Sequence, residues 1–364
     1  MTTPALKGLL RGGASRRSLL KGLGAAAAGL TFARPGFAAD EEKKLNFYNW
    51  DTYIGETTLS TFKEKAGIDI NMSLFATNDE LFAKLSAGNP GFDVIVPGSE
   101  FVERMIQADL LMPLDHSKIP NIKNVAKEFI DDAPYDPGRK YSLPYTWLVI
   151  GIGYRKSKVK AVPDSWKYLF DSDEYKDRIA VMSDASELFR HGFKYLGASI
   201  NGGNAELIKK VEEMLKKQKD NIKVFHEDNG QDLLLSGEVD VVMEYNGDIA
   251  QIMTEDKDID FVVPKEGAMM QSDSLAIPKG APHPENAHAF INHILDAEVG
   301  AEIYKTIKFP SPNEAAIAIM DDDYKKNAVI FPPAGILAKC EFPRYAGQDM
   351  TARIEEAMAN IRAD

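Results

Sequence analysis

The chain has 364 residues, with 43 Lys and Arg against 55 Asp and Glu, and a formal net charge of -12 at pH 7. An acidic surface repels phosphate backbones and anionic headgroups, which argues against nucleic acid and anionic lipid as partners. Its content of 44% apolar and 27% charged residues is ordinary for a globular protein, and the length after the N-terminal segment fits roughly two domains. The charge permits a cationic ligand without requiring one.

The N-terminal segment has the three parts of an export signal. Its basic part contains the adjacent Arg16 and Arg17, an apolar run over residues 22–33 follows, and small residues precede Ala39. This pattern predicts a signal peptide of residues 1–38, of the twin-arginine type, and hence a periplasmic location. The alternative, a retained membrane anchor, is disfavoured because a bilayer span needs roughly 20 apolar residues. Removal of the leader leaves 37 basic and 55 acidic residues, a net charge of -18.

Strand and helix patterns alternate along the rest of the chain. Apolar runs and period-two alternation predict strands over residues 46–50, 68–74, 93–97, 148–154, 178–182, 239–243, 261–263 and 275–278. Amphipathic helical patterns lie between many of them, which favours parallel sheets with right-handed crossovers. Ligands gather beyond the carboxyl ends of parallel strands. That rule singles out residues 50–53, 98–100, 184–187, 245–248 and 271–273.

Six short segments carry a resemblance to a known family through their order and spacing. They are residues 47–53 (FYNWDTY), 92–97 (FDVIVP), 143–147 (LPYTW), 264–267 (PKEG), 273–278 (DSLAIP) and 310–313 (PSPN). Together they resemble the periplasmic spermidine/putrescine-binding proteins of polyamine ABC transporters, over nearly the whole chain after the leader.

The resemblance implies an α/β, two-lobed periplasmic-binding-protein fold of type II. Each lobe would be a mostly parallel sheet flanked by helices, and crossover hinge strands would join the lobes. The first lobe would hold residues 39–148 and 273–317, and the second residues 149–272 and 318–364. The implied function is capture of a putrescine- or spermidine-class polyamine for the membrane permease of an ABC importer, by a monomer. Two alternatives stay open: the same scaffold binding a different amine, amino acid or opine, and an exported enzyme.

The resemblance also implies a binding site of aromatic walls and carboxylates. The twelve residues at the matching positions are Trp50, Asp51, Tyr53, Gly98, Glu100, Asp184, Glu187, Tyr245, Asp248, Gln271, Asp273 and Phe309. A primary ammonium group offers three donors and no acceptor, so it requires carboxylate or carbonyl oxygens. An aromatic face attracts the same cation and covers the methylenes. These residue types therefore suit an organic amine.

Four of these positions depart from the family pattern. Gly98 and Glu100 stand where a hydroxyl residue and an aromatic are usual, Gln271 replaces an aromatic, and Asp51 replaces a hydroxyl residue. The departures predict a thinner aromatic box, a more acidic site and a shifted choice among amines.

Each predicted site residue also has a structural alternative. Asp184 and Glu187 have the spacing of a capping box at a helix start. Asp248 and Asp273 could be turn acids, and the aromatic residues could be core residues. Capping and ligand binding need not exclude each other.

Catalytic and metal motifs have little support in the sequence. His288 and His293 are five residues apart, a poor metal-ligand spacing, and Cys340 is the single cysteine, without a recognisable base motif. The segment 151–153 (GIG) lacks the rest of a dinucleotide-binding fingerprint and is typical of a strand with close backbone approach. We therefore predict no catalytic residue, no metal and no cofactor.

Overall fold

The computed structural model describes residues 41–131 and 133–363, so the predicted signal peptide lies outside the described residues. The strands are β1 (Lys44–Asn49), β2 (Asp69–Leu74), β3 (Val94–Ile95), β4 (Ser142–Arg155), β5 (Ile179–Met182), β6 (Ile222–His226), β7 (Val241–Tyr245), β8 (Ile259–Val262) and β9 (Met270–Ala276). They form one nine-stranded sheet in the order β2-β1-β3-β9-β4-β7-β5-β6, with β8 paired to β4. The strand β6 was not among the sequence predictions.

The described helices are α1 (Thr58–Ala66), α2 (Asn78–Ser86), α3 (Ser99–Gln107), α4 (Lys127–Asp131), α5 (Lys167–Phe170), α6 (Ala185–Tyr195), α7 (Ala205–Gln218), α8 (Gly230–Leu235), α9 (Asn246–Ile252), α10 (Pro284–Ile294), α11 (Ala297–Ile307), α12 (Glu314–Ile319), α13 (Asp322–Lys325), α14 (Ala334–Leu337) and α15 (Gln348–Ala363). Short 3-10 turns cover His116–Lys118, Pro120–Asn124, Pro137–Arg139 and Lys219–Asn221. In the described part of the chain, no helix has both the length and the apolar character needed to cross a bilayer.

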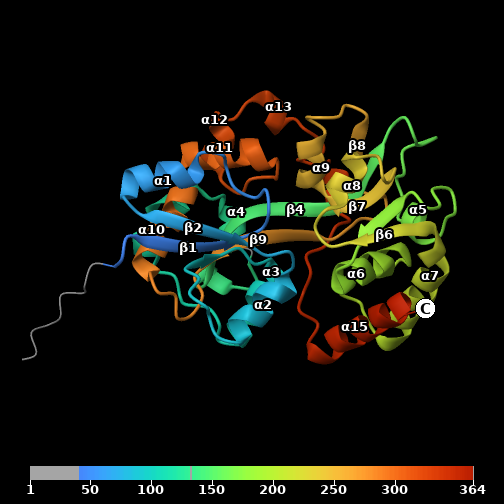
Figure 1. Cartoon of the computed structure of the whole chain (residues 1–364), viewed down its shortest axis with the longest axis horizontal. Helices are drawn as coiled ribbons and strands as arrows, with labels where there is room; N and C mark the ends of the chain where they lie inside the picture. The colour runs from blue at the N-terminus through green and yellow to red at the C-terminus, as the bar shows by residue number, and fades with distance from the viewer. Residues whose placement is uncertain (1–40, 132, 364) are drawn as a thin grey trace, which may run out of the picture. The chain divides into compact units, whose positions relative to one another are not determined.

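Helices flank both faces of the sheet at each of its ends. At the β1–β2 end, α1 and α11 lie on one side and α2 and α3 on the other (Figure 1). At the β5–β7 end, α8 and α9 lie on one side, whereas α6, α7 and the C-terminal α15 lie on the other (Figure 1). The helix α15 packs on α7 and α6, and α7 buries Ile208, Val211 and Leu215 along one stripe.

The predicted parallel pairing occurs within each end of the sheet. Strand β1 pairs in parallel with β2 and β3, and β5 pairs in parallel with β6 and β7. Between these groups, β4 and β9 pair antiparallel and run side by side through the middle of the structure (Figure 1). The sheet is therefore mixed, with parallel outer parts and two antiparallel strands that connect them.

Strand β4 changes its partners halfway along its length. Its first part, up to Val149, pairs with β9, whereas Ile150 onwards pairs with β7 and, from Ile152, also with β8. Two glycines allow the second part to be packed closely. A Cβ atom on Gly151 would lie 2.4 Å from the ring of Phe261, and one on Gly153 would lie 2.5 Å from Ile249. The glycine spacing thus reflects close approach across the sheet, as the sequence indicated.

Candidate functional site

Segments from several strand ends meet around one cavity of about 440 Å³. Strand β1 leads into Trp50–Tyr53, β6 leads into Asp228 and Gln231, and β7 leads into Tyr245 and Asp248. Strand β9 contributes Gln271 and Asp273, β4 contributes Leu148, and the turn after α11 contributes Phe309.

Aromatic rings form a fixed wall of this cavity. The indole Nε1 of Trp50 donates a hydrogen bond to the carbonyl oxygen of Val96 at 2.9 Å, and its ring lies 4.3 Å from that of Phe75. The ring of Tyr53 meets Phe309 edge to face, with centroids 5.0 Å apart. A Cβ atom on Gly247 would lie 2.3 Å from the Phe309 ring, so the ring can pack here because residue 247 has no side chain. The rings are therefore held by their surroundings and need no ligand to order them.

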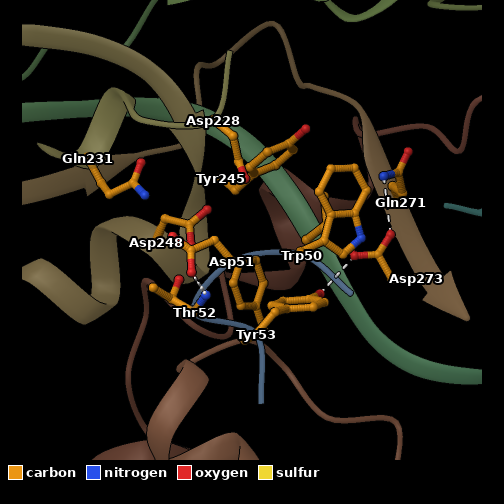
Figure 2. A pocket seen from close by; sticks show the side chains of 12 residues that line it. Trp50, Asp51, Thr52, Tyr53, Asp228, Gln231, Tyr245, Asp248, Gln271 and Asp273 are labelled. Carbon is orange, nitrogen blue, oxygen red and sulfur yellow. Dashed lines mark hydrogen bonds between the residues drawn. The ribbon is translucent and has the colours of Figure 1, made fainter. Parts of the chain in front are cut away.

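Four aspartates line the cavity: Asp51, Asp228, Asp248 and Asp273. None of the described lining residues is basic. Figure 2 shows Asp51 and Asp248 together on one side, Asp273 on the other, and the rings of Trp50 and Tyr53 between them. The cavity thus presents four acidic groups and, among its described lining residues, no basic side chain to pair with them.

The pKa values of these carboxyl groups rise because burial disfavours the charged form and neighbouring carboxylates repel one another. Burial, followed by Asp51 and Asp273, raises the pKa of Asp228 to about 7. Burial raises the pKa of Asp273 to about 6, against hydrogen bonds from Tyr53 and Gln271 that lower it. Burial, followed by Asp228 and Asp273, holds the pKa of Asp248 well above its ordinary value. A cation in the cavity would act against all three shifts, because an opposite charge favours the charged carboxylate.

Three of these four carboxylates have donors within the described part of the protein, and all of these donors are neutral groups. Tyr53 Oη donates to Oδ2 of Asp273 at 2.8 Å, and Gln271 Nε2 approaches Oδ1 of Asp273 at 3.4 Å. Gln251 Nε2 donates to Asp248 at 3.3 Å, and the backbone N–H of Thr52 donates to Asp51 at 2.9 Å. Asp228 has no hydrogen bond or ion pair with another described residue. Charge-assisted bonds from a ligand would therefore be the strongest ones available to this set.

Eight of the twelve residues predicted as ligand-binding line the cavity. They are Trp50, Asp51, Tyr53, Tyr245, Asp248, Gln271, Asp273 and Phe309. The other four, Gly98, Glu100, Asp184 and Glu187, do not line it.

Each of these four has another role in the structure. Asp184 caps α6 by accepting a hydrogen bond from the backbone N–H of Glu187 at 2.9 Å, which confirms the capping interpretation. The carboxylate of Glu187 accepts the hydroxyl hydrogen bond of Tyr245, at 2.9 and 3.0 Å to its two oxygens, so it does not close a capping box. Glu100 pairs with Arg190 at 2.9 Å, and Gly98 forms a backbone bridge with Asp273.

Sequence reasoning missed four lining residues, Thr52, Leu148, Asp228 and Gln231. Asp228 is the acidic residue among these four, and the sequence contains a pattern that could have predicted its position. Three of the five residues 222–226 are apolar, and the segment leads into a turn of Asp228, Asn229 and Gly230. The rule that ligands gather beyond strand ends would have singled out Asp228 if β6 had been recognised.

A larger open groove of about 1130 Å³ adjoins the cavity. It shares Asp51 and Asp228 with the cavity and continues between the residues after β2, Phe75 and Ala76, and those at the end of β6, His226 and Glu227. Asp51 and Asp228 thus stand at the junction of cavity and groove. Among the described residues, no group of three or more His, Cys, Asp or Glu side chains could hold a metal ion.

A cavity lined from both ends of a mixed sheet, with antiparallel strands connecting those ends, is the arrangement of a two-lobed periplasmic binding protein. Residues 57–332 match the model of the family described as bacterial extracellular solute-binding protein. The chain belongs to this family, whose members bind solutes.

Individual relatives agree with this assignment. The putrescine-binding periplasmic protein PotF of Escherichia coli is 33% identical over 334 residues, covering 87% of this chain and 90% of its own. A putrescine/cadaverine-binding protein of Pseudomonas aeruginosa is 31% identical over 315 residues, covering 83% and 89%. The solved structure of the spermidine/putrescine ABC transporter substrate-binding protein PotD from Streptococcus pneumoniae superimposes with a TM-score of 0.76 at 28% identity, covering 88% and 99%. The fold and the family therefore rest on nearly full-length matches.

Proposed function

We propose that the protein captures an organic polyamine of the putrescine or spermidine class in this cavity and delivers it to the permease of an ABC importer. The proposal rests on the lining of the cavity, which combines four aspartates with aromatic rings and has no basic side chain among its described residues. The relatives named as putrescine-binding and putrescine/cadaverine-binding proteins support the same ligand class.

The energetics of the cavity suit such a ligand. Each charge-assisted hydrogen bond contributes about 1.5–3 kcal/mol, and a cation over an aromatic face adds roughly 0.5–2 kcal/mol. Each buried methylene adds about 0.8 kcal/mol. Two ammonium ends and a short spacer can therefore reach about -8 kcal/mol, which is micromolar affinity, after the costs of association.

The same inventory of charges disfavours the alternative ligands. An amino acid or an opine carries a carboxylate, which needs a basic side chain or another anion-binding group. The described lining of the cavity offers four aspartates and no Lys, Arg or His. An anionic group placed there would meet unbalanced negative charge in a partly desolvated site.

The lobe boundaries and the route of export belong to the same proposal. The change of partners at Val149 and Ile150 of β4 supports a first lobe of residues 39–148 and 273–317. The packing of α15 on α6 and α7 supports a second lobe of residues 149–272 and 318–364. A twin-arginine signal peptide over residues 1–38 would bring the protein to the periplasm, where it would act as a monomer without nucleic acid as a partner.

A ligand panel tests the proposal. The chain from Ala39 onward is heated with putrescine, cadaverine, spermidine, several amino acids and sugars, each in large excess. A ligand present at a hundred times its Kd stabilises the folded state by about 2.7 kcal/mol, which is a clear rise in Tm. We expect a rise with at least one polyamine and none with the amino acids or sugars. No rise with any polyamine would overturn the proposed function.

A further inference from the structure

Building on the proposed function, we infer that the preferred ligand is a diamine, held by Asp273 at one end and by Asp228 with Asp51 and Asp248 at the other. Asp228 is then a ligand-contacting residue supplied by the segment between β6 and α8. The inference follows from which carboxylates near the cavity already have partners in the protein and which do not.

Three of the predicted acids, Asp184, Glu187 and Glu100, already accept hydrogen bonds from protein donors. Both oxygens of Glu187 lie within 3.0 Å of the Tyr245 hydroxyl, and Asp184 is occupied as the cap of α6. Glu100 is paired with the guanidinium of Arg190, which is itself almost fully buried. The ring of Tyr245 lines the cavity, whereas Glu187 does not. None of these three acids lines the cavity, so none is in position to hold a ligand cation inside it.

Asp228 is in the opposite situation. Its carboxylate lines the cavity, and no other described residue bonds to it. Gln231, one turn further along at the start of α8, also lines the cavity, and its Oε1 is buried without a hydrogen-bond partner among the described residues. A buried amide oxygen without a donor is costly and points to an N–H group that is supplied from the cavity. An ammonium group beside Asp228 would provide this donor.

Two separate cation positions follow from the placement of the carboxylates. Asp51 and Asp248 lie on one side of the cavity and Asp273 on the other, with the rings of Trp50 and Tyr53 between them (Figure 2). Asp228 belongs with Asp51 because both residues line the cavity and the adjoining groove, whereas Asp273 lines only the cavity. Two ammonium groups joined by a methylene spacer match this sequence of acid, aromatic ring and acid.

A third ammonium group finds no comparable position. On the side of Glu187, Tyr245 lines the cavity and its hydroxyl is bonded to the Glu187 carboxylate. In the other direction, past Asp51 and Asp228, the ligand would enter the open groove. There Glu80 already pairs with Lys84 at 2.8 Å and accepts the backbone N–H of Ala76, and Glu227 is exposed to solvent. Exposed ion pairs contribute little, so a triamine would gain less from its third charge than it loses in ordering.

Calorimetric titration of the chain from Ala39 onward with three probes tests the inference. The probes are 1,4-diaminobutane (putrescine), 1-aminobutane and spermidine. The variants are Asp228→Asn and Asp232→Asn. Asp232 is a matched control because it is an exposed acid on α8, outside the cavity, and its substitution removes the same charge. Melting temperatures without ligand establish that both variants fold.

We expect Asp228→Asn to lower the affinity for 1,4-diaminobutane at least tenfold and the affinity for 1-aminobutane less than threefold, because the monoamine can bind at the Asp273 end. The affinity of Asp232→Asn for both amines should stay within twofold of that of the unsubstituted protein. The unsubstituted protein should bind the diamine at least tenfold more tightly than spermidine. Equal losses in the two variants, equal losses for the two amines, or tighter binding of spermidine would overturn the inference. Absence of binding by all three probes to the unsubstituted protein would instead overturn the proposed function.

Discussion

The hydroxyl of Tyr53 donates a hydrogen bond of 2.8 Å to Oδ2 of Asp273, a residue 220 positions further along the chain. This bond ties the turn after β1 to strand β9. Burial and the Asp273 charge hold the pKa of Tyr53 well above its ordinary value, so the hydroxyl keeps its proton and stays a donor. The carboxylate of Asp273 is thereby oriented before any ligand arrives.

Asp273→Asn tests the charge of this carboxylate. The substitution keeps the side-chain shape and removes a charge-assisted hydrogen bond, so we expect a loss of about 1.5–3 kcal/mol in the binding of putrescine. The measurement is calorimetric titration at pH 8. Tyr53→Phe serves as a comparison and should give a smaller loss, because Asp273 keeps its charge. Putrescine affinities within twofold of the unsubstituted protein in both variants would rule out this role for Asp273.

Trp50→Leu tests the aromatic wall. Leucine keeps apolar surface but removes the ring face, and we expect the free energy of binding to weaken by roughly 0.5–2 kcal/mol. Part of this change comes from the lost hydrogen bond to Val96. Phe309→Leu offers a second ring substitution in the same wall. If neither variant changes the Kd for putrescine, the rings do not face the ligand.

Tyr245→Phe tests the hydrogen bond that occupies Glu187. Without the hydroxyl, both oxygens of a buried carboxylate lose their donor, and we expect the free energy of unfolding to fall by about 1–3 kcal/mol. Denaturant titration measures this change. Tyr195→Phe is the matched control, because its hydroxyl bond to Asp171 is exposed and should contribute only a few tenths of a kcal/mol. Equal changes in the two variants would contradict the importance of burial.

Glu100→Ala tests the pair between α3 and α6. Arg190 would stay buried without its carboxylate, although Asn201 and the Arg344 carbonyl oxygen still accept from it. Loss of one partner from a buried pair costs about 3–5 kcal/mol, and we expect the free energy of unfolding to fall by the lower end of this range. Thermal and denaturant unfolding measure this change. Glu213→Ala, in an exposed pair with Lys209, should cost well under ~1 kcal/mol. A change of more than threefold in putrescine affinity for Glu100→Ala would show that Glu100 contacts the ligand after all.

Ligand binding and stability without ligand should depend on pH in opposite directions. The folded-state pKa values of Asp228 and Asp273, about 7 and about 6, lie above the ordinary aspartate value of about 3.9. The folded state therefore holds more protons than the unfolded state between these values, and stability without ligand falls as pH rises from about 4 through about 7.

Binding of an ammonium group requires the charged carboxylates, so putrescine affinity should rise over the upper part of the same window. Thermal unfolding and calorimetry at pH 5, 6, 7 and 8 measure both trends. Asp228→Asn should flatten each of them. Stability without ligand that increases from pH 5 to pH 8 in step with affinity would contradict the placement of these carboxyl groups in a desolvated cluster.

Local sequence patterns predicted much of the lining of the cavity, because strand ends carry it. Trp50 and Tyr53 follow a strand with clear apolar alternation, and Asp248 follows the apolar run of β7. Asp228 escaped because β6 is short and half-buried, with Lys223 exposed and Val224 and Phe225 only partly buried. A strand of this kind at the edge of a sheet has a weak periodic signal.

Long-range partners could not be predicted from local sequence. The pairing of Glu100 with Arg190 joins residues 90 positions apart, so no local spacing reveals it. Likewise, the antiparallel pairing of β4 with β9 depends on a partner more than a hundred residues later. The alternation of strands and helices predicted parallel sheets, and it is silent on the two strands that connect them.

The most direct test of the central claim is a calorimetric titration of the chain from Ala39 onward with putrescine at pH 8. We predict binding of one putrescine per chain with micromolar or tighter affinity, weakened at least tenfold by Asp273→Asn. No binding of putrescine or any other amine at millimolar concentration, with binding of an anionic or neutral solute instead, would contradict it.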